Sequence, residues 1–372
     1  MKIGLIGAGR LGICLALLIE KAGYKVLASD NRVDYIKDLQ KGIINTAEPE
    51  VQQYLSNANN IEFTTDNTRV IDECDIIFTL VATPSLEDGS YDVSAVWKVI
   101  DDFKETPILL DEKSLIVGCT TNPGDCNDFE NALKNRGIDI FYNPEFIAQG
   151  SIITDLQNAD MVLIGGDGAH KSELEKMYEK IQMGFISPSI YFMSTKAAEV
   201  TKIALNCFLT TKISYANMLG QVLTMSGMED EIDNVLNSIG SDKRVGKKYL
   251  KYGFGFGGPC FPRDNRAFAS YASKVGVDHN IGHVTDAFNE DHATFLKEYF
   301  MFKNKKKMPF FFNYLTYKPN TDILTESQQY RLCLDLLNEG HVVYCGDSSL
   351  KNQCDSRILY EKPTEQVFEI NL

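Results

Sequence analysis

Hydrophobic and polar residues follow two different patterns along this chain. From residue 1 to about residue 190, short runs rich in β-branched and aromatic residues are separated by amphipathic stretches. This alternation predicts an α/β fold in which helices cover both faces of a parallel sheet. The runs that we expect to form strands are residues 2–7, 25–30, 75–82, 107–113, 138–143 and 161–166.

The second pattern begins at Ser194. Residues 194–225 contain no Pro and a single Gly, Gly220, and their apolar residues recur at intervals of three and four. This periodicity predicts one long helix. Sequence typical of helices continues to about residue 303, interrupted by the glycine-dense stretch 253–264.

A basic linker, KNKKK at 303–307, precedes a return to the first pattern. Residues 308–318 are typical of a strand, and residues 328–345 of a helix followed by a strand. We therefore predict three domains. They are an N-terminal Rossmann-type domain with a doubly wound parallel sheet (1–193), a central long-helix domain (194–303) and a short C-terminal α/β domain (304–372).

Composition narrows the class of protein. The net charge of −14 argues against nucleic acid or an anionic membrane as a partner. The nine cysteines contain no C-x-x-C pair, so neither a secreted disulfide framework nor a zinc site is expected, and we predict a cytoplasmic protein. The N-terminus lacks the features of a signal peptide, and no apolar run approaches the ~20 residues of a membrane span.

The first predicted strand leads into the turn GAGRLG at residues 7–12. Gly7 permits a tight turn, Gly9 lets the backbone approach a pyrophosphate, and Gly12 allows the next helix to pack closely on the strand. Asp30 follows the second strand, where a carboxylate would accept both ribose hydroxyls and repel a 2′-phosphate. We therefore expect NAD rather than NADP, although Arg32 nearby could accommodate a 2′-phosphate.

Candidates for covalent chemistry lie in the stretch GFGFGGPCFPRD, residues 253–264. Its glycines permit close backbone approach to a ligand. Cys260 stands at the expected start of a helix, whose dipole would stabilise a thiolate, and Asp264 would lie one turn away. A single Cys is more often a small buried apolar residue, so these residues alone leave both interpretations open.

Several motifs together resemble the UDP-glucose/GDP-mannose dehydrogenase family, and they occur in the order of that family over most of the chain. FGFGGPCFPRD (254–264) is similar to the family signature GFGG-x-C-x-x-K-D, and NPEFIAQG (143–150) to its NPEF segment. Residues 197–218 resemble its long helix with spaced Glu, Lys and Asn. SDKRVG (241–246) resembles its D-x-R-x-G turn, and YKPNTDILTES (317–327) its C-terminal motif.

This resemblance implies a four-electron oxidation of the C6 hydroxyl of a nucleotide sugar, using two NAD and one water, and the expected reaction is UDP-glucose to UDP-glucuronate. Cys260 would attack the aldehyde and carry a thiohemiacetal and then a thioester. Asp264 would be the general base, and Lys202 and Asn206, four residues apart on one helix face, would stabilise the oxyanion. Glu145 would be a second acid near the reaction centre.

The resemblance also implies ligand contacts. Those to the cofactor are Gly7, Ala8, Gly9, Arg10, Leu11, Gly12, Asp30, Thr83, Pro84, Ser114, Glu145 and Arg263. Those to the sugar nucleotide are Phe146, Lys202, Asn206, Arg244, Tyr249, Phe254, Gly255, Gly257 and Lys318. At Gly255 a free backbone amide would suit a phosphate, and Arg244 would act from a neighbouring subunit, which implies a homodimer built on the long helix.

Departures from the family pattern qualify these expectations. Counting back from Gly118 puts Ser114 at the Thr of the family's K-S-T-x-P-x-G segment, as a catalytic and cofactor-binding hydroxyl. Gln149 replaces a Glu, Thr325 stands where an Arg normally helps to hold the cofactor, and Tyr314 replaces a Gly. About 65 residues follow the linker, whereas a full nucleotide-binding α/β domain has roughly 100, so we expect a shortened UDP-binding domain.

Two other functions stay open. A non-catalytic NAD-binding or nucleotide-sugar-binding homologue would fit the lost Arg and the shortened tail. A two-electron hydroxy-acid dehydrogenase would explain the glycine-rich turn and the Lys–Asn helix but would leave Cys260 without a role. The sugar is also open, because the family serves UDP-glucose, UDP-N-acetylhexosamines and GDP-mannose.

Overall fold

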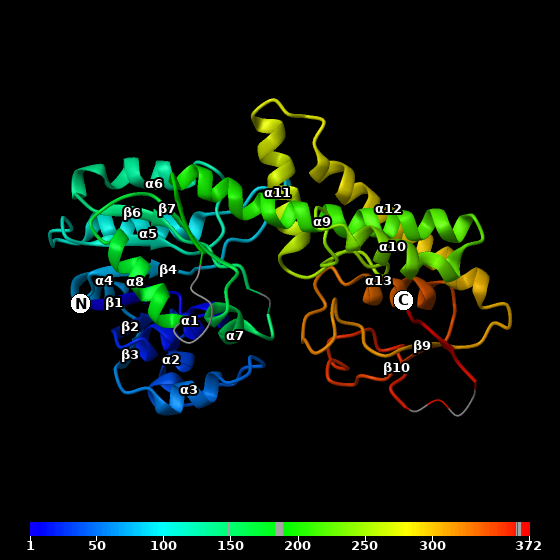
Figure 1. Ribbon diagram of the computed structural model, residues 1–372. Coiled ribbons are helices and arrows are strands. Elements are labelled where there is room, and N and C mark those ends of the chain that lie inside the picture. The colour runs from blue at the N-terminus through cyan, green and yellow to red at the C-terminus, as the bar shows by residue number, and fades with distance from the viewer. Residues whose placement is uncertain (148, 183–188, 362, 364–365) are drawn as a thin grey trace. The chain divides into compact units, whose positions relative to one another are not determined.

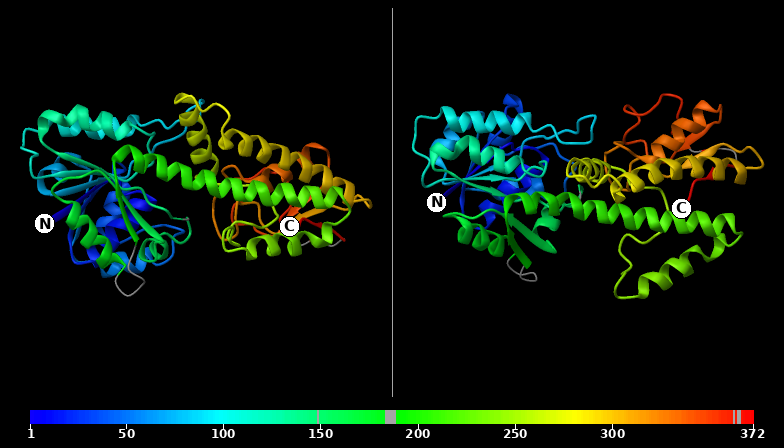
Figure 2. Two further views of the ribbon diagram at one scale, coloured as in Figure 1. Left: turned by 45° about the horizontal axis from the view of Figure 1, so that its top comes forward. Right: turned by 90° about the horizontal axis from the view of Figure 1, so that it is seen from above.

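The computed structural model describes residues 1–147, 149–182, 189–361, 363 and 366–372. They divide into two compact units, Met1–Lys202 and Ile203–Leu372. The boundary falls inside one continuous helix, α9 (Thr195–Met225), which confirms the predicted long helix (Figures 1 and 2). Each unit has hydrophobic cores of its own.

The N-terminal unit is built on a sheet that, in its described residues, has eight strands in the order β3-β2-β1-β4-β5-β6-β7-β8. The first six strands are parallel and have the order of a doubly wound dinucleotide-binding sheet. The predicted Rossmann-type fold is therefore confirmed. The strands are β1 (Lys2–Ile6), β2 (Lys25–Ser29), β3 (Ile61–Thr64), β4 (Ile76–Thr79), β5 (Ser114–Val117), β6 (Asp139–Tyr142), β7 (Met161–Gly165) and β8 (Ser189–Met193).

The sheet is not parallel throughout, because β7 runs antiparallel to β6. The connection between these two strands leaves β6 at its carboxyl end and returns at the same edge of the sheet. The segment that follows β6, which contains Glu145, is thereby kept at the edge where the glycine-rich turn after β1 also lies.

Helices cover both faces of this sheet (Figure 1). One core gathers α1, α2, α3, α7 and α8, and the other gathers α4, α5 and α6. Residues 12–19 of α1 are all buried because other helices pack on its outer side, which suits an almost wholly apolar sequence. The helices are α1 (Arg10–Lys21), α2 (Val33–Gln40), α3 (Val51–Asn57), α4 (Asn67–Glu73), α5 (Ser94–Glu105), α6 (Asp125–Leu133), α7 (Ile152–Gln157) and α8 (Lys171–Ile181).

One predicted strand is wrong: residues 107–113 form a loop. Pro107 has no N–H for a sheet ladder, Lys113 N donates to Leu110 O within a turn (2.9 Å), and Leu109 is 83% exposed. The strand of this region is β5, which begins one residue later at Ser114. The hydrophobic pattern also missed β3 and β8, whose exposed positions weaken the signal.

The C-terminal unit packs helices against a small parallel sheet with the order β10-β9-β11 in its described residues. Its main core joins Phe310 and Phe312 of β9 to residues of α12 and α13. The predicted strand within 308–318, and the helix and strand within 328–345, are confirmed. Besides α9, the elements are α10 (Ile232–Ser241), α11 (Phe261–Lys274), α12 (Ile281–Lys303), β9 (Phe310–Phe312), α13 (Gln328–Asn338), β10 (Val343–Cys345) and β11 (Phe368–Glu369).

Within the described ranges, no helix combines the length and the apolar character that crossing a bilayer requires.

The single glycine of α9 is explained by packing. A Cβ at Gly220 would lie 2.0 Å from Cδ2 of Tyr252, so the aromatic ring rests directly on the helix backbone. Helix propensity alone would favour Ala over Gly at this position by about 1 kcal/mol. The close approach of the ring outweighs that preference.

We predict that Gly220→Ala destabilises the C-terminal unit by about 1–3 kcal/mol through overpacking. Hydrogen exchange of the α9 amides around residue 220 would measure the loss locally. In a Tyr252→Leu background the ring is gone, so the same substitution should cost much less. Equal protection in Gly220→Ala and wild-type protein would contradict the proposed packing.

Candidate active site

The turn from Gly7 to Gly12 joins β1 to α1 at the carboxyl edge of the sheet. Gly7 has a φ of 100°, and a Cβ on Gly12 would lie 2.1 Å from Gly7 O, so the backbone requires glycine at both positions. A Cβ on Gly9, in contrast, would meet no described atom within 4 Å. The turn is therefore tight on its inner side and open at Gly9.

The amino end of α1 suits a diphosphate. The N–H groups of its first residues have no acceptor within the helix, and the macrodipole adds positive potential there. The N-cap, Gly9, has no side chain that would compete for these donors. Ala8 is buried and Leu11 is partly buried at the same turn. The residues present thus fit the dinucleotide that the sequence predicts.

Asp30 directly follows β2 and is held by Arg32. The Arg32 Nε and Nη2 atoms each lie 2.7 Å from an oxygen of the Asp30 carboxylate. The guanidinium also lies 4.1 Å from the centre of the Tyr35 ring. A ribose that bound to Asp30 would share this carboxylate with Arg32 or displace it.

Arg10 connects the glycine-rich turn to the segment after β6. Arg10 Nη1 donates to Gln149 Oε1 (3.0 Å) and lies 4.0 Å from Glu48 Oε1. Glu48 is 5% exposed and accepts from the N–H of Gly150 (2.8 Å) and of Ile152, at the start of α7. Gln149 therefore accepts a hydrogen bond from Arg10 through a neutral amide, and Glu48 supplies the negative charge that Gln149 lacks.

Glu145, Phe146 and Lys202 lie together in the N-terminal unit. Lys202 Nζ donates to the backbone oxygen of Glu145 (2.7 Å) and lies 4.7 Å from the centre of the Phe146 ring. Removal from water raises the pKa of the Glu145 carboxyl to about 7, against the opposing effects of Tyr178 and Lys202. A carboxyl with a pKa near neutrality can serve as an acid or a base at physiological pH.

Ser114 does not belong to this group, and its predicted role is wrong. It is the first residue of β5 and pairs in register with Ile76 and Asp139, so it lies at the amino edge of the sheet. The length of β5, about 10 Å, separates it from the edge that carries the glycine-rich turn. Ser114 is fully buried, and its Oγ lies 2.9 Å from His170 Nδ1.

Thr120 is a second hydroxyl that matches the motif, and the sequence analysis did not consider it. Counting back from Gly124 instead of Gly118 puts Thr120 at the Thr position of the motif, with Asn122 at the Pro position and Pro123 one residue later. Thr120 follows the carboxyl end of β5 and is partly exposed. Thr83 and Pro84 likewise follow the carboxyl end of β4.

The C-terminal unit brings Asn206, Cys260 and Asp264 together. Cys260 is the N-cap of α11, as predicted, and Asp264 N donates to Cys260 O (2.9 Å) in the first turn. Asn206 Nδ2 donates to Asp264 Oδ2 at 2.6 Å, and both side chains are less than 10% exposed. Among the nine cysteines, all of them described, Cys260 is the exposed one.

The glycines before Cys260 approach the protein's own chain. A Cβ on Gly257 would lie 2.3 Å from Glu326 O, which no side chain could tolerate. The amide of Gly255 was expected to be free, but it donates to Gln328 Oε1 at 2.6 Å. A phosphate at this amide would have to share it with Gln328 or displace that side chain. Phe254 is partly buried against the core of α12 and α13.

His292 holds the start of this loop. Its Nε2 lies 2.8 Å from Gly253 O and its Nδ1 2.8 Å from Gln221 Nε2. Because a carbonyl oxygen can only accept, Nε2 carries the hydrogen and Nδ1 accepts from Gln221. Burial lowers the pKa of His292 to about 4.

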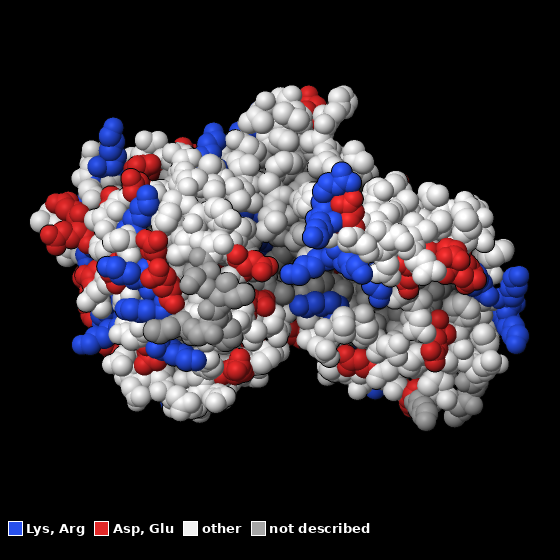
Figure 3. Space-filling view, viewed as in Figure 1, with Lys and Arg blue, Asp and Glu red and all other residues white. Residues whose placement is uncertain are grey.

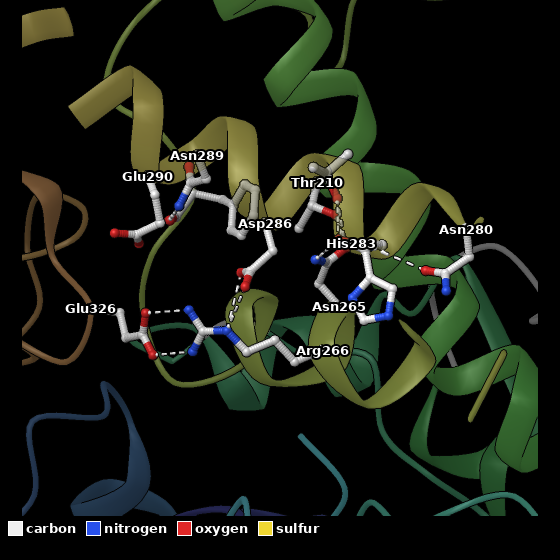
Figure 4. Close-up of polar contacts among 12 residues, drawn as sticks. Thr210, Asn265, Arg266, Asn280, His283, Asp286, Asn289, Glu290 and Glu326 are labelled. Atoms are coloured by element: carbon white, nitrogen blue, oxygen red, sulfur yellow. Dashed lines mark hydrogen bonds and ion pairs between the residues drawn. The ribbon is translucent and has the colours of Figure 1, made fainter. Parts of the chain in front are cut away.

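Arg266, which sequence analysis also missed, joins three segments beside Asp264. Arg266 Nε lies 3.1 Å from both carboxylate oxygens of Asp286 on α12, and its two Nη atoms lie 2.6 and 3.1 Å from those of Glu326 (Figure 4). Glu326 has a φ of 52°, which is costly for a residue with a side chain. The ion pairs stabilise this turn, whose backbone contacts Gly257.

The other predicted contacts are spread over the C-terminal unit. Arg244 is 89% exposed in its side chain and pairs with Asp242 (2.7 Å). Tyr249 is 46% exposed and packs edge-to-face on Phe261. Lys318 is partly buried beside the Tyr317 ring, and Arg263 is partly buried on the first turn of α11.

Acidic and basic side chains are interspersed over the N-terminal unit on the face shown in Figure 3. In the same unit, Lys2, Glu62, Arg69 and Glu73 form a cluster of ion pairs in which each charge has an opposite neighbour.

Comparison with known proteins gives consistent results. Residues 1–182 match the NAD binding domain of the UDP-glucose/GDP-mannose dehydrogenase family, and residues 196–291 match its central domain. YtcA of Bacillus subtilis (strain 168), provisionally named a UDP-glucose 6-dehydrogenase, is 30% identical over 359 residues, which are 93% of this chain and 81% of YtcA.

Solved structures show the same similarity. The UDP-glucose dehydrogenase of Pyrobaculum islandicum superposes with a TM-score of 0.84 at 25% identity, covering 97% of this chain and 86% of that one. The UDP-D-ManNAc dehydrogenase of Pyrococcus horikoshii has the same fold, with a TM-score of 0.79 at 22% identity over 94% of this chain and 86% of its own.

The buried, neutral His292 predicts a pH dependence of stability. Its pKa is about 4 in the folded chain and 6.5 as the ordinary value, so the unfolded chain binds more protons between these limits. The stabilisation is complete above pH ~6.5 and is lost as the pH falls towards 4, by at most about 3 kcal/mol.

In His292→Gln, which keeps a donor for Gly253 O, urea unfolding followed by circular dichroism should show a smaller loss of stability over this pH window. The exposed His279 provides the control, because His279→Gln should retain the wild-type slope. The same slope in His292→Gln and wild-type protein would contradict a neutral His292.

Proposed function

We propose that this chain, which belongs to the UDP-glucose/GDP-mannose dehydrogenase family, oxidises the C6 hydroxyl of a nucleotide sugar through a covalent intermediate on Cys260. The family's members are NAD-dependent nucleotide-sugar dehydrogenases, so the expected cofactor and enzyme class are confirmed. The observation that carries the covalent mechanism is the exposed thiol of Cys260 one turn from the buried Asn206–Asp264 pair.

The proposed reaction has two oxidations and one hydrolysis. Bound NAD would accept a hydride in each oxidation. In the first oxidation the alcohol loses its proton and a hydride and becomes an aldehyde. The aldehyde carbon then forms a bond to Cys260 Sγ. The second oxidation converts this thiohemiacetal to a thioester. Water then adds to the thioester carbonyl, the carbon–sulfur bond breaks, and the acid and the thiol are released.

Asp264 is suited to accept protons in these steps. Asn206 donates to one oxygen of its carboxylate and so fixes the orientation of the side chain. Its position in the first turn of α11 places it next to Cys260, the N-cap of the same helix. Lys202, one turn before Asn206 on α9, would provide positive charge for the oxyanion, and Glu145 would be the second proton acceptor.

UDP-glucose is the first candidate substrate. YtcA and the Pyrobaculum islandicum enzyme are named for it, and they are the more similar relatives described above. We propose that residues 304–372, which contain β9, β10, β11 and α13, contribute the uridine contacts, with Lys318 among them.

A count of NADH tests the mechanism. Wild-type protein with limiting UDP-glucose should form two NADH per sugar, measured by absorbance and product analysis. Cys260→Ser should be slowed by several orders of magnitude, because an alcohol is a far weaker nucleophile than a thiolate. The partly buried Cys354 supplies the matched control, and Cys354→Ser should retain activity.

Other outcomes identify the alternatives. One NADH per substrate would indicate a two-electron dehydrogenase and exclude the thioester. Tight binding of NAD and nucleotide sugar by calorimetry, with no turnover on UDP-glucose, UDP-N-acetylhexosamines or GDP-mannose, would indicate a binding homologue. Turnover with another of these sugars would keep the mechanism and reject UDP-glucose.

We also propose that the chain forms a homodimer through α9. An apolar stripe on this helix is exposed in the single chain: Phe208 (62%), Tyr215 (44%), Met218 (40%), Val222 (53%) and Met225 (78%). Their spacing of seven, three, four and three residues puts them on one side of the helix. An exposed stripe of this length is typical of a surface that another helix covers.

Val222→Glu should shift the protein from dimer to monomer in analytical ultracentrifugation, because the new charge would be buried at the interface. Leu109, 83% exposed in a loop of the N-terminal unit, provides the control, since Leu109→Glu should leave the dimer intact. A wild-type monomer at micromolar concentration would refute the dimer.

A further inference from the structure

Three polar side chains of the N-terminal unit, Asn143, Tyr178 and Glu145, are joined in a row by hydrogen bonds. The Tyr178 hydroxyl on α8 lies 2.7 Å from Glu145 Oε1 and 2.5 Å from Asn143 Oδ1. Tyr178 and Asn143 are 1% and 2% exposed. Asn143 directly follows β6, so the rigid sheet fixes one end of the row and Glu145 forms the other.

The orientation of the Asn143 amide is determined by its second contact. Asn143 Nδ2 donates to Leu163 O on β7 at 2.9 Å. If the amide were flipped, Asn143 Oδ1 would face Leu163 O, and both oxygens are acceptors. Oδ1 must therefore face Tyr178. Asn143 can therefore only accept from the tyrosine hydroxyl.

The Tyr178 hydroxyl carries one hydrogen, yet two oxygens that can accept it, Glu145 Oε1 and Asn143 Oδ1, lie within hydrogen-bond distance. If Tyr178 donated to an ionised Glu145, its oxygen and Asn143 Oδ1 would be buried at contact distance without a hydrogen between them, which is unfavourable. A hydrogen on the Glu145 carboxyl removes the conflict. Glu145 then donates to Tyr178, and Tyr178 donates to Asn143.

We propose that Glu145 is a neutral carboxylic acid in the free protein, at one end of this hydrogen-bonded row. Tyr178 is a positioning residue, and the acceptor Asn143 makes ionisation of Glu145 less favourable through the Tyr178 hydroxyl. When Glu145 ionises, the Tyr178 hydrogen turns to the carboxylate and Asn143 loses its donor. The catalytic consequence rests on the proposed function, in which Glu145 serves as a base during turnover.

The surroundings of Glu145 agree with this assignment. Among the described residues, the titratable groups that act on it are Tyr178 from α8 and Lys202 from α9. Lys202 donates to the backbone oxygen of Glu145, and its positive charge acts to lower the pKa of the carboxyl. Limited contact with water raises the pKa of Glu145 to about 7 in spite of both neighbours.

A double-mutant cycle tests the coupling. Infrared titration would follow the carbonyl band of the protonated Glu145 carboxyl, identified by its absence in Glu145→Gln. Asn143→Leu keeps the side-chain volume and removes the acceptor, so Tyr178 can donate to the carboxylate without loss. The midpoint should fall by roughly 0.5–1 pH unit, the effect of one hydrogen bond.

In a Tyr178→Phe background, Asn143→Leu should leave the Glu145 midpoint unchanged, because the connecting hydroxyl is absent. An equal shift in both backgrounds would mean that the substitution acts through packing or water entry and would overturn the proposal. So would an ordinary carboxyl midpoint in the wild-type protein. If Asn143→Leu does not fold, Asn143→Ala takes its place in the same cycle.

Turnover separates this inference from the proposed function. The rise of kcat with pH should move to lower pH in Asn143→Leu by the same amount as the infrared midpoint, with KM for the sugar little changed. If the midpoint shifts as expected but the kcat profile does not, the hydrogen-bonded row is supported and the role of Glu145 as a base is rejected.

Discussion

The hydrogen bond between Asn206 and Asp264 is the contact on which the candidate site depends. It joins α9 to the first turn of α11 inside a region from which water is excluded. A buried carboxylate and amide would each be costly without this partner. Because Asp264 lies one turn after Cys260, the same bond fixes the helix start that presents the thiol. The next residue, Asn265, accepts hydrogen bonds from Thr210 on α9 and from Thr285 on α12, and Figure 4 shows Thr210 beside Asn265.

Much of this arrangement could be predicted from the sequence. The glycine spacing, Asp30 after a strand, and the uninterrupted periodicity of residues 194–225 are local signals, so the Rossmann-type sheet and α9 were predicted correctly. The position of Cys260 at the N-terminus of a helix could also be predicted from nearby residues alone. These features depend on backbone geometry over a few residues and not on distant partners.

The errors arose where the outcome depends on distant parts of the chain. Ser114 and Thr120 both match a hydroxyl position in a motif, and only the register of β5 decides which reaches the carboxyl edge. The Gly255 amide is engaged by Gln328, 73 residues away. Arg266 was missed because its two carboxylate partners, Asp286 and Glu326, lie 20 and 60 residues further on. Composition and periodicity carry no information on such pairings.

The most direct test of covalent catalysis is a search for the intermediate itself. Wild-type protein and Asp264→Asn protein would each be mixed with NAD and UDP-glucose, quenched in acid at a series of times, digested and examined by mass spectrometry. We expect an acyl adduct of the sugar nucleotide on the peptide that contains Cys260. Formation of the uronate by wild-type protein, with Cys260 unmodified in both proteins at every time sampled, would contradict it.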